Sequence, residues 1–339
     1  MANSVVQQLL QIAGDKISRK EILNIRVDRT VPAGINATKR ICNENCIFDH
    51  ATGARCNDDL FLNEQGPALS NEDFVKIIKD LASVAGKKVR VHIAGDGEPT
   101  LLNNELVQFV KMLKGIDIVT SVKLTTNGTL LSTGTPSLAR RLGEAGLDNI
   151  NLSLHTLKAD TFKEITGIDA LDIVLKGIDS AVAAGIKTSI NCVLRPETLE
   201  ELESFIELSK NKGVIIKFFS LLSHTESVQK EYDALIDKLK SSLAALADEY
   251  TGYAYPYDGM VYRIGGAIID VKDSRTNRCP NISCSYRSMC VEGCRYEARV
   301  SRTGILQPCG VRSDNKIKMT KPSITQNEIA AALASGGKL

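Results

Sequence analysis

Short β-rich segments alternate with helical segments along the first two thirds of the chain, and this alternation limits the possible folds more than any other feature. The β-rich segments cover residues 22–27, 89–94, 122–126, 149–154, 188–194 and 214–222. Most are separated by segments whose apolar residues recur at helical spacing, such as NEDFVKIIKDLASVAG. This repeat predicts βαβ units around a parallel sheet. We therefore expect an α/β fold, in which six such units form either a partial barrel or an open sheet.

In both architectures the functional site lies at the carboxyl ends of the parallel strands. Cys42, residues 95–99, residues 126–128 and His155 each follow a predicted strand. Because the carboxyl ends of parallel strands meet at one edge, we expect these residues to share one functional rim.

Composition excludes several classes of protein. Of the 339 residues, 42 are Lys or Arg and 40 are Asp or Glu, which gives a net charge of +2 and no basic excess for nucleic acid. The sequence has no run of about 18 apolar residues, so no membrane span is predicted. The first 20 residues lack an apolar signal core, so we expect a cytoplasmic protein.

The chain is expected to divide into four parts. A long helical stretch near 226–249 precedes hairpin-like residues 251–273 and a Cys-rich region with little apolar periodicity. A metal cluster is expected to organise that region. The predicted domains are an N-terminal helical segment (1–20), a core (21–225), a C-terminal cluster domain (226–316) and a tail (317–339).

Cysteines fall into two groups, and this segregation indicates metal or redox chemistry in a reducing compartment. The early group is Cys42, Cys46 and Cys56, and the late group is Cys279, Cys284, Cys290, Cys294 and Cys309. Cys192 stands apart in the apolar run SINCVL, where we expect a small buried hydrophobe.

The early group has the spacing Cys42-x3-Cys46-x9-Cys56. Thiolates suit zinc or an iron–sulfur cluster. Three ligands leave one metal position open for a substrate or cofactor, whereas a structural zinc site requires four. His50 is a candidate fourth ligand, so zinc remains an alternative for this loop alone.

Polar turns follow the next strands. The glycines of AGDGEPT (94–100) allow close backbone approach to a ligand, and Glu98 offers an acceptor for an ammonium group. TTNG (125–128) follows the third strand, and NLSLH (151–155) forms the fourth. Each alone is compatible with an ordinary turn or strand, but their placement at successive strand ends indicates one site.

Together these motifs resemble the radical SAM superfamily, which implies a partial (β/α)6 TIM-like barrel. The resemblance implies that Cys42, Cys46 and Cys56 bind three irons of a catalytic [4Fe–4S] cluster, whose fourth iron binds S-adenosylmethionine (SAM). It further implies an electron donor such as flavodoxin or ferredoxin, and hydrogen abstraction by a 5′-deoxyadenosyl radical. The residues that match SAM-binding positions are Gly95, Gly97, Glu98, Thr126, Asn127, Ser153 and Asn191.

One departure concerns the third ligand. The superfamily usually has C-x3-C-x2-C, but Asp49 stands where the third cysteine is expected. Cys56 is our expected ligand because thiolate is the normal cluster ligand. Asp49 and His50 are the alternatives.

A narrower resemblance, over about residues 89–316, is to the GTP 3′,8-cyclase family. The segment CRYEARVSRTGILQPCGVRSDN is similar to that family's second-cluster segment and to the auxiliary-cluster hairpins of twitch and SPASM domains. The resemblance implies a second [4Fe–4S] cluster on Cys290, Cys294 and Cys309 with Cys279 or Cys284, and a substrate facing Arg299 and Tyr296. A zinc ribbon is the alternative.

At two positions where the related family has phosphate-binding residues, this chain has different residues. Glu297 stands where the family has arginine, and Ser189 where it has lysine. The candidates for a rebuilt basic site are Lys39, Arg40, Arg295, Arg299 and Arg312. We therefore expect a radical SAM enzyme acting on a nucleotide- or sugar-like small molecule. The alternatives are GTP 3′,8-cyclase activity itself, a SPASM-type peptide maturase, and a zinc-stabilised binding protein.

Overall fold

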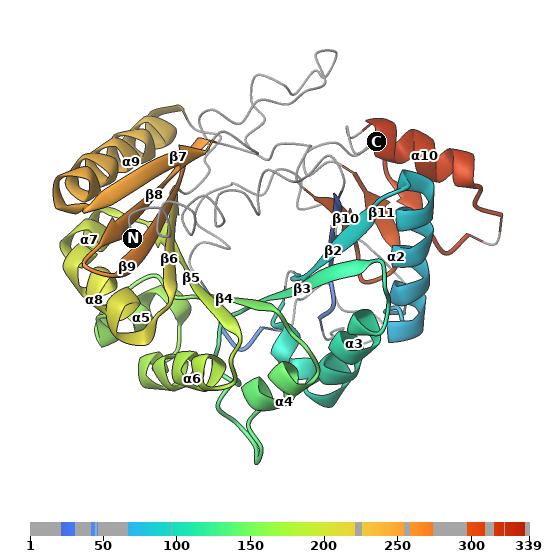
Figure 1. Ribbon diagram of the computed structural model, residues 1–339, viewed down its shortest axis with the longest axis horizontal. Coiled ribbons are helices and arrows are strands. Elements are labelled where there is room, and N and C mark those ends of the chain that lie inside the picture. Colours follow the sequence, from blue (N-terminus) through green and yellow to red (C-terminus); the bar gives the residue numbers. More distant parts are fainter. Residues whose placement is uncertain are drawn as a thin grey trace, which may run out of the picture.

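The computed structural model describes residues 22–30, 42–44, 46, 67–95, 97–220, 226–253, 258–273, 297–308, 315–321 and 323–335. Within these residues twelve strands form one sheet in the order β12-β11-β10-β1-β2-β3-β4-β5-β6-β9-β8-β7. The sheet curves around a concave face and does not close, since its edges are β12 and β7 (Figure 1). The prediction of a partial α/β barrel is therefore confirmed.

The six central strands follow chain order and run parallel to one another. They are β1 (Ile22–Val27), β2 (Lys88–Ile93), β3 (Val119–Thr126), β4 (Asn149–Ser153), β5 (Lys187–Leu194) and β6 (Ile215–Ser220). All six predicted strands are present, with bounds that differ by a few residues.

Helices cover the outer, convex face of this sheet (Figure 1). They are α2 (Asn71–Ala85), α3 (Asn104–Lys114), α4 (Leu138–Glu144), α5 (Ala159–Thr166), α6 (Leu171–Ala183), α7 (Pro196–Glu200) and α8 (Leu202–Lys212), with a short 3₁₀ helix, η3 (Pro99–Leu102). The predicted capping box that begins α2 is present, because Ser70 and Asp73 each accept from the other's backbone N–H.

The apolar face of each strand explains which side chains reach the concave face. In β2 the side chains of Val89, Val91 and Ile93 are buried in the core against the helices. Successive strand residues point to opposite faces. Arg90 and His92, which alternate with these residues, therefore point to the concave side.

Strands from the C-terminal third join both sides of the same sheet. Helix α9 (Glu226–Leu246) leads to the antiparallel strands β7 (Glu249–Tyr253), β8 (Asp258–Ile264) and β9 (Ala267–Asp273). β9 pairs in parallel with β6, and β10 (Ala298–Val300) pairs in parallel with β1. The domain boundaries remain a prediction, but strands on both sides of residue 225 share one sheet.

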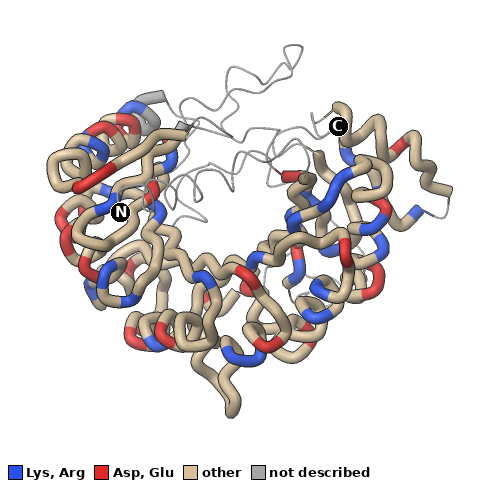
Figure 2. Tube along the Cα trace, viewed as in Figure 1, with Lys and Arg blue, Asp and Glu red and all other residues tan. Residues whose placement is uncertain are grey.

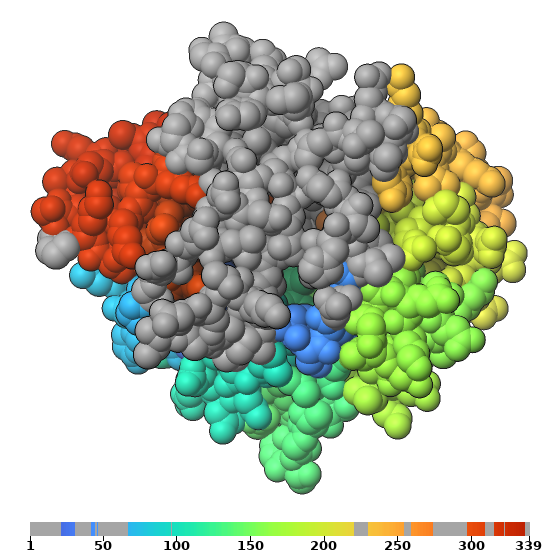
Figure 3. All heavy atoms as spheres, turned by 180° about the vertical axis from the view of Figure 1, so that it is seen from behind, coloured from blue at the N-terminus to red at the C-terminus, as the bar shows by residue number. Residues whose placement is uncertain are grey.

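The segment that is similar to auxiliary-cluster hairpins contains a hairpin around Gly304, since β10 and β11 (Ile305–Gln307) are antiparallel neighbours. β12 (Ile317–Lys318) completes this edge, and α10 (Gln326–Ser335) packs against α2. Seen from behind, the described residues of β10–β12 and α10 and those of the α9 region lie on opposite flanks of the molecule (Figure 3). No helix in the described ranges has the length and apolar character needed to cross a bilayer. Charges of both signs are interspersed along the outer helices (Figure 2).

Candidate functional site

The turns after β2 and β3 are tied together by one buried carboxylate. Glu98 is 2% exposed, and its Oε1 accepts hydrogen bonds from Thr100 N (2.9 Å), Thr100 Oγ1 (2.5 Å) and Thr126 Oγ1 (2.5 Å). Its Oε2 accepts from Asn127 N (2.8 Å). Burial raises the pKa of Glu98, against the lowering effect of these four bonds. Both oxygens thus serve the protein's own turns, and the role of ammonium acceptor stays a prediction.

Asn127 extends this brace to the first cysteine. Its Nδ2 lies 3.8 Å from Cys42 Sγ and donates to Asn43 Oδ1 at 2.7 Å, while its Oδ1 accepts from Thr129 N and Oγ1. The following residue, Gly128, has a φ of +82°, and a Cβ there would lie 2.5 Å from Leu152 Cδ2. Only glycine fits this turn without strain.

The two described cysteines of the early group are half-buried thiols on the segment after β1. Glu44 N donates to Cys42 Sγ at 3.5 Å, and Cys46 Sγ lies 3.5 Å from Glu44 Oε2. Burial, and the nearby charge of Glu98, raise the pKa of Glu44 to about 7, although the Cys46 contact lowers it. The two N–H groups on Cys42 Sγ suit a thiolate, so the donor set fits an iron–sulfur cluster.

A complete ligand set is not visible in the part of the chain that the structure describes, where no three His, Cys, Asp or Glu residues form a metal-binding group. Cys56 and its alternatives Asp49 and His50 lie outside the described residues. So do all five late cysteines (279, 284, 290, 294 and 309), Tyr296, and the basic candidates Lys39, Arg40, Arg295 and Arg312.

The two glycines of the GDGEP turn differ in their surroundings. A Cβ on Gly95 would lie 1.9 Å from Asp28 Oδ1, which itself accepts from Thr30 Oγ1 at 2.8 Å. The space that Gly95 leaves is therefore filled by the end of β1. Gly97 is half-buried in the same turn.

Polar side chains of β4 and β5 lie side by side on the concave face. Ser153 and Asn191 are register partners, and Asn191 Oδ1 is buried with no hydrogen-bond partner among the described residues. Lys217, the register partner of Asn191 on β6, donates from Nζ to Asn151 Oδ1 at 3.0 Å. A buried acceptor without a partner favours a ligand with hydroxyl or ammonium donors, so these residues fit SAM.

A row of basic residues crosses the concave face below these turns. Arg299 pairs with Arg26, Arg26 with His92, and His92 with Lys123 in the register of four neighbouring parallel strands. Arg299 thus lies in this row on the concave face, and its role in facing the substrate stays a prediction. Glu297 contacts this row through His92, at 2.8 Å between Oε1 and Nδ1.

The charges in this row shift two pKa values. Burial, and then the charge of Lys123, lower the pKa of His92 to about 3, against the effect of Glu297. Burial raises the pKa of Glu297, but contact with His92 and the charges of Lys123 and Arg26 outweigh it and lower that pKa. Glu297 is therefore an anion whose charge is locally balanced.

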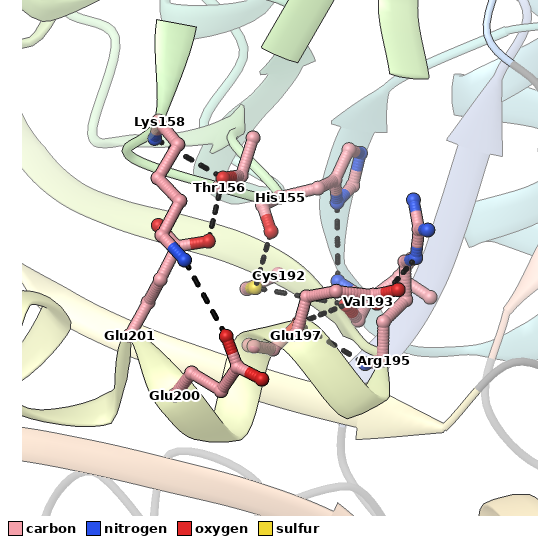
Figure 4. Close-up of polar contacts among 10 residues, drawn as sticks. His155, Thr156, Lys158, Cys192, Val193, Arg195, Glu197, Glu200 and Glu201 are labelled. Carbon is pink, nitrogen blue, oxygen red and sulfur yellow. Dashed lines mark hydrogen bonds and ion pairs between the residues drawn. The ribbon is translucent and has the colours of Figure 1, made fainter. Parts of the chain in front are cut away.

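His155 lies after β4 as predicted, in a second set of polar contacts (Figure 4). Its Nδ1 accepts from Val193 N at 3.1 Å, and burial together with Arg195 lowers the pKa of His155 to about 4. Glu201 accepts from Thr156 Oγ1 and Leu157 N, both at 2.6 Å. These contacts fix the loop that follows β4.

Cys192 has no exposed surface, as predicted for a small buried hydrophobe. Its Sγ lies 3.7 Å from the carbonyl oxygen of His155, and burial raises the pKa of the thiol (Figure 4).

Comparison with known proteins agrees with this geometry. Residues 37–209, half of the chain, match the model of the radical SAM superfamily. A protein of Methanothermobacter marburgensis named "Probable GTP 3',8-cyclase" is 30% identical over 300 residues, which cover 87% of this chain and 88% of that protein. A second protein with the same name, from Saccharolobus solfataricus, is 40% identical over 174 residues, 51% of each chain.

Solved structures share the fold. Streptococcus suis SuiB bound to precursor peptide SuiA gives a TM-score of 0.60 at 15% identity, covering 99% of this chain and 72% of SuiB. In another crystal structure of SuiB the matched region covers 60% of that chain. Identity this low shows the fold alone. The family match and the 30% identical relative establish that this chain belongs to the radical SAM superfamily and is an enzyme of the radical SAM type.

Proposed function

We propose that this enzyme binds SAM at a [4Fe–4S] cluster on Cys42, Cys46 and Cys56 and acts on a nucleotide-like small molecule. The observation that carries the proposal is the connection from Glu98 through Asn127 to Cys42, because it joins the three predicted SAM-site loops in one hydrogen-bonded unit. When bound, the cluster and SAM supply a 5′-deoxyadenosyl radical that takes a hydrogen atom from the substrate.

The protein's own residues hold and orient these groups. Asn127 and Glu44 N direct N–H groups at Cys42 Sγ, which favours the thiolate. Asn191 Oδ1 offers an acceptor to a hydroxyl or ammonium group of SAM. Glu98 keeps both turns in place, so the pocket is organised before the ligand arrives.

The basic row supports a nucleotide-like substrate. Arg26, Lys123 and Arg299 place three positive side chains on one face, and Arg side chains suit phosphate recognition. Glu297 is turned toward His92 and offsets part of this positive charge, but the three cations of the row outnumber it. Near Ser189, where the related family has lysine, Lys217 reaches across from β6 to Asn151. GTP is therefore the first substrate to test.

A second [4Fe–4S] cluster on Cys290, Cys294 and Cys309, with Cys279 or Cys284, is part of the proposal. Its support is the β10–β11 hairpin, whose sequence is flanked by Cys294 and Cys309. An electron donor such as flavodoxin or ferredoxin would reduce the SAM cluster.

The test is anaerobic reconstitution with iron and sulfide, followed by incubation with SAM, dithionite and GTP. We expect about eight irons per chain and a GTP-derived product identified by mass spectrometry. SAM cleavage without GTP consumption would keep the radical chemistry and refute GTP as substrate. Zinc instead of iron, with no SAM cleavage, would refute the whole proposal.

A further inference from the structure

Three polar side chains, two on neighbouring strands and one just before a third strand, form one hydrogen-bonded chain on the concave face. Glu297 Oε1 lies 2.8 Å from His92 Nδ1, and His92 Nε2 lies 2.8 Å from Thr125 Oγ1. The side chains of Glu297 and His92 are 8% and 14% exposed. Glu297 precedes β10, His92 lies on β2 and Thr125 on β3, so these hydrogen bonds cross β1.

The charges around this chain fix where its protons lie. Lys123 on β3 and Arg26 on β1 stabilise an ionised Glu297, and the same two charges oppose a protonated His92. A neutral His92 beside an ionised Glu297 carries its proton on Nδ1, because a carboxylate only accepts. Its Nε2 is then an acceptor, and the hydrogen of the Thr125 hydroxyl must point to it.

This arrangement has a consequence for Thr125. With its hydrogen committed to His92, Oγ1 has only acceptor capacity left. Thr125 is half-buried, and its register partner on β4 is Asn151, the acceptor of the Lys217 bond. The next two residues of the same strand end, Thr126 and Asn127, belong to the Glu98 brace. Thr125 therefore lies between the basic row and the SAM-site turns.

We propose that Glu297, acting through His92, holds Thr125 Oγ1 as an acceptor-only oxygen that selects a hydroxyl donor of a bound nucleoside. This inference rests on the proposed function. Glu297 and His92 are positioning residues, whereas Thr125 contacts the ligand. A ribose hydroxyl supplies the required donor, and both SAM and GTP carry one.

The first experiment reads the proton position directly. Full-length reconstituted protein is labelled with ¹⁵N-histidine, and the His92 signal is assigned by its loss in His92→Gln. We expect a neutral ring protonated at Nδ1 from pH 5 to pH 8, and a shift toward the other tautomer in Glu297→Gln. A protonated ring, or one protonated at Nε2 in the wild type, would overturn the proposal even if SAM is cleaved.

The second experiment measures dissociation constants for SAM and for GTP separately. Thr125→Val is expected to weaken binding of one of them about 10- to 100-fold, because a buried donor loses its acceptor. Thr125→Ser, which keeps the hydroxyl, should stay within about 3-fold of the wild type. Glu297→Gln should fall between the two. Weakened SAM binding assigns the donor to SAM, and weakened GTP binding assigns it to the substrate. Unchanged constants for both ligands would overturn the proposal.

Discussion

Replacing Glu98 with glutamine tests whether this carboxylate braces the two turns. Glutamine has the same shape but one oxygen and one NH₂ group. With its oxygen at the Oε1 position, it keeps the bonds from Thr100 and Thr126 but points an NH₂ at Asn127 N, a donor against a donor. In the opposite orientation the NH₂ faces Thr100 N, and the two threonine hydroxyls can rotate to accept from it, so either orientation leaves one backbone N–H without its acceptor.

The magnitude follows from that single lost bond. A hydrogen bond to a charged group contributes about 1.5–3 kcal/mol, and an unsatisfied buried N–H costs a similar amount. Glutamine carries no charge, so it avoids the cost of burying a carboxylate. The same cost raises the pKa of Glu98, and avoiding it offsets part of the loss. We expect Glu98→Gln to lower the free energy of unfolding by roughly 2 kcal/mol. Glu98→Ala leaves the backbone N–H groups of Thr100 and Asn127 both unpaired, so its loss should be roughly 4 kcal/mol.

Urea unfolding followed by circular dichroism measures these differences. The matched control is Glu144→Gln, because Glu144 is an exposed carboxylate whose ion pair with Arg140 lies on the surface of α4. Such a pair contributes about 0.3–0.5 kcal/mol. If Glu98→Gln is no more destabilising than Glu144→Gln, the brace is refuted.

Two further changes have expected outcomes of similar clarity. Gly128→Ala combines a φ of +82° with a Cβ 2.5 Å from Leu152, so it should destabilise the protein by about 3 kcal/mol. Gly185→Ala has a φ of +73° and no atom within 4 Å of the added Cβ, so it should cost only about 1 kcal/mol. Equal effects of the two substitutions in thermal unfolding would contradict the packing argument. His155 has a pKa of about 4 in the folded protein against 6.5 ordinarily, so the unfolded chain takes up the proton first and stability falls on acidification between these values. His155→Asn, which keeps an acceptor for Val193 N, should remove about 1.4 kcal/mol per pH unit of that slope, and an unchanged slope in urea titrations at pH 4.5 and 5.5 would show that His155 does not titrate in this way.

Local sequence patterns predicted much of the fold because each depends on neighbouring residues. The alternation in KVRVHI fixes which side chains of β2 face the helices, and Ser70 with Asp73 fixes the start of α2. The TTNG turn requires glycine at position 128 because of its positive φ and the closeness of Leu152. The radical SAM motifs then chose between a partial barrel and an open sheet, which periodicity alone left undecided.

The sequence did not predict the contacts that cross strands distant along the chain. His92 and Glu297 are 205 positions apart, and they meet because β10 pairs with β1, a pairing that chain order does not indicate. For the same reason the sequence shows Glu297 only as a departure from the family's arginine and does not predict its contact with His92. Thr125 was missed as well, since Thr126 was chosen from the same motif although its hydroxyl is directed at Glu98.

The most direct test of the account is whether the early cysteines are needed to split SAM. Reconstituted wild type, Cys42→Ala, Cys46→Ala and the control Cys192→Ala are incubated anaerobically with SAM and dithionite, and 5′-deoxyadenosine is quantified. Cys192 is buried in the hydrophobic core, so its variant should cleave SAM like the wild type. We predict that Cys42→Ala and Cys46→Ala form no 5′-deoxyadenosine above the protein-free background. Undiminished formation by Cys46→Ala, or none by an iron-loaded wild type, would contradict the account.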